Sequence, residues 1–172
     1  DSDRETYIAM VESMDKGIGQ VVAKLDELGL QKNTLVVFMS DNGGHTWSSN
    51  APLRDYKGTR WEGGVRVPCI ASWPGAIEPG RVSNQVGITM DWTSTFYRLA
   101  QLPKDPAGED GIDLSPVLTS ANESIQRTLF WRRRPSERRK KVRAGRAVRD
   151  GDWKLITYED GERHLFDLGK DI

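Results

Sequence analysis

Apolar residues recur every three or four positions between residues 5 and 28, the spacing that lines one face of a helix. These residues are Ile8, Val11, Met14, Ile18, Val21, Val22, Leu25 and Leu28. We predict a helix over residues 5–28 that ends at Gly29, because glycine accepts the left-handed backbone found after helix ends. Residues 34–40 form a continuous apolar run, which is typical of a buried parallel strand. A helix followed by a buried strand indicates an α/β sheet.

The pattern changes after Ser40. Residues 41–68 contain five glycines and show no hydrophobic period, so we predict a long loop of the kind that often carries function. Residues 69–73 predict a second short strand, in which we expect Cys69 to be a small buried apolar residue. A helix is expected over residues 91–102, capped by Asp91 and with Phe96, Leu99 and Ala100 facing inward.

The last third of the chain predicts a small antiparallel sheet, after loops and short turns over residues 103–120. Its strand candidates are residues 128–132, 147–149, 154–158 and 164–168. Asp150-Gly151 and Asp160-Gly161 are hairpin turn signals between them.

The composition is that of a globular chain, with 37% hydrophobic residues and 25 Lys and Arg against 25 Asp and Glu. The neutral balance argues against general nucleic-acid affinity. No apolar run approaches the roughly 20 residues of a membrane helix, and the chain does not open with a secretory signal. A single cysteine, Cys69, excludes an internal disulfide and a cysteine-only zinc site.

Two segments carry candidate chemistry. Ser40-Asp41-Asn42-Gly43-Gly44 follows the predicted strand, at the end where α/β sheets bind ligands. Asp41 and Asn42 offer hard oxygen donors that suit Ca²⁺ or Mg²⁺, although the segment is also consistent with a plain Asn-Gly turn. Lys57 stands beside glycines, an arrangement that suits a tetrahedral oxyanion but also a solvated polar loop.

The order of the segments resembles the sulfatase family of the alkaline phosphatase superfamily, including its arylsulfatases. The similar segments are YIAMVESMDKGIGQVVAKLDELGL, NTLVVFMSDNGG, KGTRWEGGVRVP, ASWPG, DLSPVL, AVRDGDWKLI and HLFDL. The resemblance implies part of an alkaline-phosphatase-like α/β sheet sandwich over residues 1–120. A small antiparallel subdomain is implied over residues 121–172. It also implies that Asp41 and Asn42 bind a divalent cation, usually Ca²⁺ with Mg²⁺ as the alternative, and that Lys57 contacts the substrate's sulfate.

The chain departs from the family in one respect. Sulfatases hydrolyse esters with a formylglycine made from Cys or Ser in a C/S-x-P/A-x-R motif of an amino-terminal half, which this sequence does not contain. Cys69 is a poor substitute because Trp73 stands where that motif has arginine. His45 and His164 are the two histidines of the chain, and no Ser-His-acid set is evident around either. Of the two, His45 is the candidate for contacting substrate or protonating a leaving group.

We therefore expect the carboxy-terminal portion of a sulfuric ester hydrolase, inactive alone, with formylglycine in the missing half. Two alternatives stay open: a phosphodiesterase or phosphonate hydrolase relative, or a non-catalytic polyanion-binding remnant. The expected partners are a sulfate ester, including sulfated polysaccharides, and either a second copy or the amino-terminal half. No specific nucleic acid and no membrane are expected. Family members are often periplasmic, secreted or lysosomal, but the location of this chain is unknown.

Three further features were interpreted from the residues. Ten basic residues and one acid, Glu137, lie between Trp131 and Arg149. We expect this arginine-rich run, residues 132–149, to be an exposed insertion between two strands, with residues 133–144 mobile when no polyanion is bound. The alternatives are a polyanion site and salt-sensitive nucleic-acid affinity. Arg60 could reinforce the oxyanion site or pair internally with Glu62. Three tryptophans are expected to be packing residues: Trp61, Trp73 and Trp92.

Overall fold

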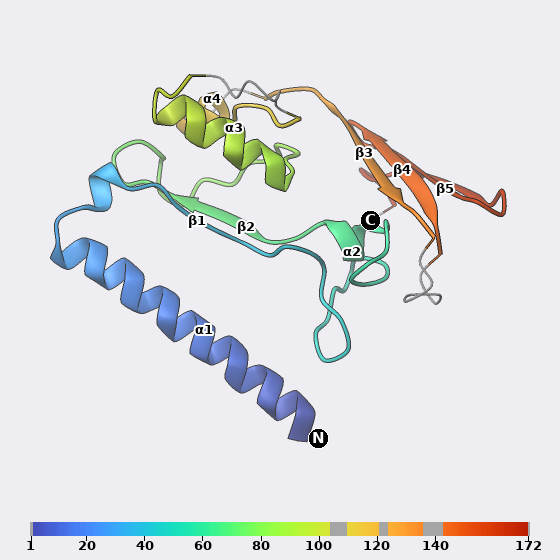
Figure 1. Cartoon of the computed structure of the whole chain (residues 1–172), viewed down its shortest axis with the longest axis horizontal. Coiled ribbons are helices and arrows are strands. Elements are labelled where there is room, and N and C mark those ends of the chain that lie inside the picture. The colour runs from blue at the N-terminus through green and yellow to red at the C-terminus, as the bar shows by residue number, and fades with distance from the viewer. Residues whose placement is uncertain (1, 104–109, 121–123, 136–142, 172) are drawn as a thin grey trace. The chain divides into compact units, whose positions relative to one another are not determined.

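The computed structural model describes residues 2–103, 110–120, 124–135 and 143–171. The predicted first helix is α1, Ser2–Glu27 (Figure 1). Gly29 has a φ of 67°, and its N–H donates to Asp26 O at 2.9 Å. The prediction that glycine ends this helix is confirmed. A short 3₁₀ turn, η1 (Gln31–Asn33), leads from it to the first strand.

The two predicted short strands form a two-stranded sheet. They are β1, Val36–Met39, and β2, Cys69–Ser72. Both strands were predicted, but their expected burial was wrong: β1 is half-buried along its length and Cys69 is exposed. The reason is that, among the described residues, β2 is the one strand that pairs with β1.

A short helix, α2 (Glu62–Val65), lies inside the stretch expected to be loop. Its two glycines explain why the sequence did not predict it, since glycine is a poor helix former. Packing requires them instead. A Cβ on Gly63 would lie 2.3 Å from Asp55 O, and a Cβ on Gly64 would lie 2.6 Å from Thr59 O.

The predicted second helix is α3, Thr89–Leu99, and a further short helix, α4 (Ser115–Thr119), replaces part of the expected loop. The expected cap position was wrong: Ile88 is the N-cap residue and Asp91 lies in the first turn, where its buried carboxylate accepts backbone N–H bonds from Ile88 at 2.7 Å and Ile112 at 3.0 Å. The expected inward face was wrong. Phe96 and Ala100 are exposed and Leu99 is half-buried, whereas α3 buries Asp91, Trp92, Ser94 and Thr95.

The predicted antiparallel sheet is present, with strand order β3-β4-β5-β6 (Figure 1). Its strands are Thr128–Arg133, Gly145–Asp150, Trp153–Tyr158 and Arg163–Asp167. Gly151 and Gly161 have φ values of 57° and 90°, as the two hairpin signals require. The buried core of this region is Trp61, Ala147 and Ile156.

The arginine-rich run is partly strand. Arg132 and Arg133 belong to β3, and Arg146 and Arg149 belong to β4, so the expectation that all of residues 132–149 form an insertion was wrong. Arg132 lies opposite Arg146 in the β3–β4 pair, and Arg149 lies opposite Leu129. Residues 136–142 lie outside the described residues, so the expected mobility of the run stays a prediction.

The chain divides into two compact units. The first contains residues 1–23, 38–69 and 127–172, and the second contains residues 24–37 and 70–126. Every candidate site residue therefore lies in the first unit. The expected division at residue 120 stays a prediction. None of the helices formed by the described residues is long and apolar enough to span a membrane.

Candidate functional site

The strand-end motif follows β1 directly. The Ser40 hydroxyl donates to the Asn42 carbonyl at 2.8 Å, and the Ser40 N–H donates to Pro68 O at 3.3 Å. These bonds turn the chain immediately after the strand. Asp41 is exposed and Asn42 is half-buried. Within the described part of the chain, no hydrogen bond or ion pair reaches the Asp41 carboxylate, which leaves its oxygens available to a ligand.

The glycines of this motif pack against α2. Gly43 N–H donates to Gly64 O at 3.1 Å. A Cβ on Gly43 would lie 1.7 Å from Gly63 O, a distance that no packing tolerates. The two backbones thus touch directly, and glycine is required at this approach. The contact brings the two segments that the sequence analysis selected, residues 40–44 and 57–68, into one site.

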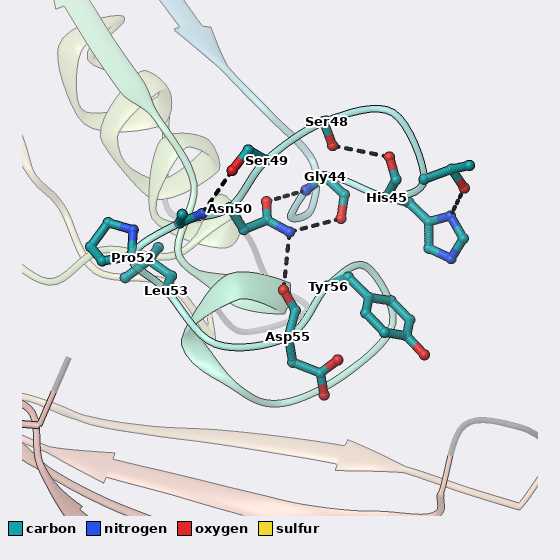
Figure 2. Close-up of a pocket in the computed structure, with 11 residues that line it drawn as sticks. Gly44, His45, Ser48, Ser49, Asn50, Pro52, Leu53, Asp55 and Tyr56 are labelled. Atoms are coloured by element: carbon teal, nitrogen blue, oxygen red, sulfur yellow. Dashed lines mark hydrogen bonds between the residues drawn. The ribbon is translucent and has the colours of Figure 1, made fainter. Parts of the chain in front are cut away.

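Lys57 joins the same site through its backbone. Its N–H donates to Gly44 O at 3.1 Å, two residues beyond Asn42. Asn50 completes the arrangement with three hydrogen bonds, shown in Figure 2. Its Oδ1 accepts from Gly44 N–H at 2.8 Å, and its Nδ2 donates to Gly44 O and to Asp55 O, both at 3.0 Å. Sequence reasoning missed Asn50, because a single amide in a polar loop has no distinguishing pattern.

The predicted ligand and substrate roles of Asp41, Asn42 and Lys57 stay predictions. No group of three or more His, Cys, Asp and Glu side chains that could hold a metal occurs among the described residues. His45 is exposed, its Nδ1 is hydrogen-bonded to the Thr46 hydroxyl, and its ring meets that of Tyr56 edge to face at 5.1 Å. The site therefore offers two hard oxygen donors, one ammonium and one imidazole.

The first residue of α2, Glu62, forms a buried ion pair that the sequence analysis also missed. Glu62 Oε1 accepts from Lys154 Nζ at 2.6 Å, and Lys154 is 1% exposed. Arg149 approaches Glu62 Oε2 to 3.7 Å and Arg66 approaches it to 3.9 Å. Burial lowers the pKa of Lys154, and the hydrogen bond to Glu62 opposes that shift. The pair ties α2 to β5 across 92 positions of sequence.

The alternative pairing of Arg60 with Glu62 is not formed. Arg60 is buried, and its Nη2 donates to Arg143 O at 2.9 Å. Desolvation lowers its pKa, while Tyr158 opposes the shift. Trp61 packs as expected: it is buried, and its Nε1 donates to the Tyr158 hydroxyl at 3.0 Å. Trp92 is also buried. Trp73 is half-buried and donates to Lys32 O.

Known families match both parts of the chain. The family described as sulfatase matches residues 1–102. The family described as N-sulphoglucosamine sulphohydrolase, C-terminal, matches residues 55–172. Arylsulfatase A of Homo sapiens is 37% identical over 169 residues, covering 95% of this chain and 32% of that protein. Steryl-sulfatase of Mus musculus is 48% identical over 137 residues, covering 72% of this chain and 22% of that protein.

Solved structures agree with these matches. The structure described as Ps i-CgsB in complex with k-i-k-neocarrahexaose has a TM-score of 0.88 and 31% identity, over 99% of this chain and 38% of that one. BT4656 in complex with D-glucosamine-2-N,6-O-disulfate has a TM-score of 0.73 and 25% identity, over 94% of this chain and 33% of that one.

The chain thus spans between about a fifth and two fifths of the proteins that it matches. The strand-end motif, the lysine segment and the antiparallel sheet follow one another in the order that the resemblance implied. The sulfatase family matches residues 1–102, and a relative is 37% identical over 95% of this chain; the chain therefore belongs to the sulfatase family of the alkaline phosphatase superfamily.

Proposed function

We propose that this chain forms one side of the active site of a sulfuric ester hydrolase. In this proposal Lys57 binds the sulfate group, and Asp41 and Asn42 bind a divalent cation. The observation that carries it is the hydrogen bond from Lys57 N–H to Gly44 O at 3.1 Å. This bond joins the segment that bears the ammonium to the segment that bears the oxygen donors. The sulfatases among the relatives support the reaction class.

The donor set fits a hard cation in part. The Asp41 carboxylate is exposed and the Asn42 amide offers a second oxygen, and both suit Ca²⁺ or Mg²⁺. Calcium takes about six to eight oxygens, so two protein ligands predict weak binding. When bound, the cation supplies Lewis-acid polarisation of a sulfate oxygen. The chain's own contribution is the Lys57 ammonium, which stabilises negative charge on the transferring group.

The proposed substrate class is a sulfate ester of a carbohydrate. The sulfated sugars in the complexes of Ps i-CgsB and BT4656 support this choice. Sulfate and phosphate have similar tetrahedral shapes, and a phosphonate monoester hydrolase shares the fold. Aryl sulfate and aryl phosphate should therefore be assayed in parallel.

We expect the isolated chain to show no turnover of an aryl sulfate at saturating Ca²⁺, because the sequence contains no C/S-x-P/A-x-R motif. A colorimetric assay on repurified protein measures this. Turnover that survives repurification and disappears in Lys57→Ala would contradict the expectation that the chain is inactive alone.

Binding can be measured without turnover. Mn²⁺ should broaden the amide NMR signals of Asp41 and Asn42, and Asp41→Asn should remove the effect, whereas Asp152→Asn, on an exposed hairpin residue, should not. Inorganic sulfate should shift the Lys57 amide in the parent chain but not in Lys57→Ala. Equal loss of Mn²⁺ broadening in both aspartate variants would refute the metal assignment. Salt-dependent heparin binding that leaves Lys57 unaffected would favour the polyanion-binding alternative.

A further inference from the structure

An open hollow lies beside the strand-end motif. Its volume is about 620 Å³, and it is lined by residues between Gly44 and Tyr56 (Figure 2). Asn42 precedes this stretch by two residues and Lys57 follows it immediately. A molecule bound in the hollow would therefore lie next to whatever Lys57 and Asn42 bind.

The walls of the hollow are fastened by their own hydrogen bonds. Asn50 bonds both Gly44 and Asp55, so its amide has little capacity left for a ligand. The Ser48 hydroxyl donates to His45 O at 3.0 Å, and Ser49 Oγ accepts from Ala51 N–H at 3.2 Å. The hollow is thus largely formed before anything binds, as ligand pockets usually are.

Two residues on the same walls have a left-handed backbone. Among the described non-glycine residues, those with positive φ are Thr46 at 41°, Asp55 at 73° and Gln101 at 53°. Thr46 and Asp55 line the hollow. A left-handed backbone costs a β-branched residue such as Thr46 about 1–2 kcal/mol, whereas aspartate tolerates it more readily, and such strain tends to persist where a ligand site requires it. The strain therefore favours a binding function over an ordinary surface loop.

The exposed groups indicate the chemistry of the ligand. The rings of His45 and Tyr56 meet edge to face at 5.1 Å, and Tyr56 is 43% exposed. No hydrogen bond from the described residues reaches the Asp55 carboxylate, which accepts hydrogen bonds when ionised. Thr46, Ser48 and Ser49 also line the hollow. An aromatic edge beside a carboxylate and hydroxyls suits a ligand with an apolar C–H face and several hydroxyl groups.

We propose that the hollow binds the sugar ring that carries the sulfate ester, with Tyr56 and Asp55 as specificity-determining residues. The proposal rests on the proposed function of Lys57, which would hold the sulfate of the same molecule. The Tyr56 ring packs against the C–H face of the sugar, and the Asp55 carboxylate accepts hydrogen bonds from its hydroxyls. A steroid or simple aryl group would leave these polar walls unpaired, at a cost in binding.

The test compares methyl β-galactoside with its 6-sulfate by saturation-transfer NMR and by amide shifts of the full chain. We expect both sugars to shift the amides of Gly44, Ser48 and Ser49, and the saturation-transfer signal of the unsulfated sugar to be lost in Tyr56→Ala. Asp55→Asn is expected to weaken binding about tenfold while keeping the loop, because asparagine tolerates the left-handed backbone. Unchanged amides elsewhere show that each variant is folded.

The matched control is Trp153→Ala, which removes an exposed aromatic ring from β5. Sugar binding that survives Tyr56→Ala, or that is lost equally in the Trp153 variant, would overturn the proposal. Lys57→Ala separates it from the proposed function. If the unsulfated sugar binds and the sulfate adds no affinity that depends on Lys57, the hollow stands and the sulfate role fails. If sulfate binds through Lys57 and neither sugar shifts the amide signals of the hollow, the sulfate role of Lys57 stands and the sugar-binding proposal fails.

Discussion

Glu62 shows how much one carboxylate can determine in this chain. It is buried and faces Lys154, Arg149 and Arg66 at 2.6, 3.7 and 3.9 Å. Lys154 has Glu62 as its carboxylate partner among the described residues, whereas Glu62 has further cations nearby. Removing the Glu62 charge therefore leaves Lys154 without a carboxylate partner, whereas removing the Lys154 charge leaves Glu62 with two nearby arginines.

We expect Glu62→Gln to reduce the free energy of unfolding by about 3 kcal/mol, because it leaves the Lys154 ammonium buried and uncompensated. Lys154→Met should cost about 1 kcal/mol, since Arg149 still faces Glu62 and the apolar stem is kept. Urea unfolding measures both. Arg66→Gln is the control and should change little, because Arg66 is half exposed. A larger loss in Lys154→Met than in Glu62→Gln would contradict this account.

Gly43 provides a second test at the residue scale. A Cβ there would meet Gly63 O at 1.7 Å, whereas a Cβ on Gly17 would meet nothing within 4 Å. We expect Gly43→Ala to destabilise the chain by more than about 2 kcal/mol, because the two backbones must separate. Gly17→Ala, inside α1, should stabilise it by about 0.5–1 kcal/mol. Thermal unfolding of the two variants should move in opposite directions; equal shifts would refute the packing argument.

Among the elements, the four-stranded sheet is fastened at one end by Arg143. Its guanidinium contacts the carboxylates of Asp160 and Glu162, on the turn between β5 and β6. Hydrogen bonds from Arg143 lower the pKa of both carboxyls below their ordinary values of 3.8 and 4.5. The same bonds raise the pKa of Arg143. The turn thus carries a small pH-dependent stabilisation.

The direction of that dependence follows from the lowered pKa values. The stabilisation is fully present above the ordinary carboxyl values and is lost as the pH falls through the lowered ones. We expect the advantage of the parent chain over Arg143→Gln to shrink as urea unfolding is repeated at increasingly acid pH. Arg163→Gln, an exposed arginine of β6, is the control. An advantage that is constant with pH would show that Arg143 acts through packing on Tyr158, which it covers at 3.7 Å.

On the scale of the whole molecule, the main feature is an uncovered apolar surface on α1. Ile8, Val11, Met14, Val21 and Val22 are each between 41% and 59% exposed. Large exposed apolar patches mark interaction surfaces or cause aggregation. The helix is therefore suited to bury this face against a second copy or against another part of a longer protein.

We expect the isolated chain to self-associate through α1. Sedimentation over a concentration series should show species larger than the monomer, and Met14→Lys combined with Val21→Lys should shift the chain toward the monomer. Val82→Lys is the control, because Val82 is 89% exposed outside α1. A monomer that unfolds cooperatively at every concentration would show that the chain closes its own core. It would also weaken the interpretation of the chain as the carboxy-terminal portion of a sulfatase.

The sequence by itself determined those elements whose signals are local. The period of three and four residues predicted α1, Gly29 predicted its end, and the two Asp-Gly turns predicted the hairpins, because each signal depends on neighbours along the chain. The two site segments were recognisable for the same reason. Their roles in binding metal and sulfate are still predictions from resemblance.

Tertiary structure alone decided the features that depend on contacts between distant residues. Glu62 pairs with Lys154, 92 positions away, and no pattern near either residue announces that pairing. The two glycines of α2 disfavour a helix locally, yet the close approach of Asp55 O to Gly63 and of Thr59 O to Gly64 requires glycine at both positions. The sequence could not predict burial either, because the apolar period of α1 specifies a face of the helix but not what covers that face. Local geometry follows from adjacent residues, whereas burial and ion pairing follow from whatever the rest of the chain brings into contact.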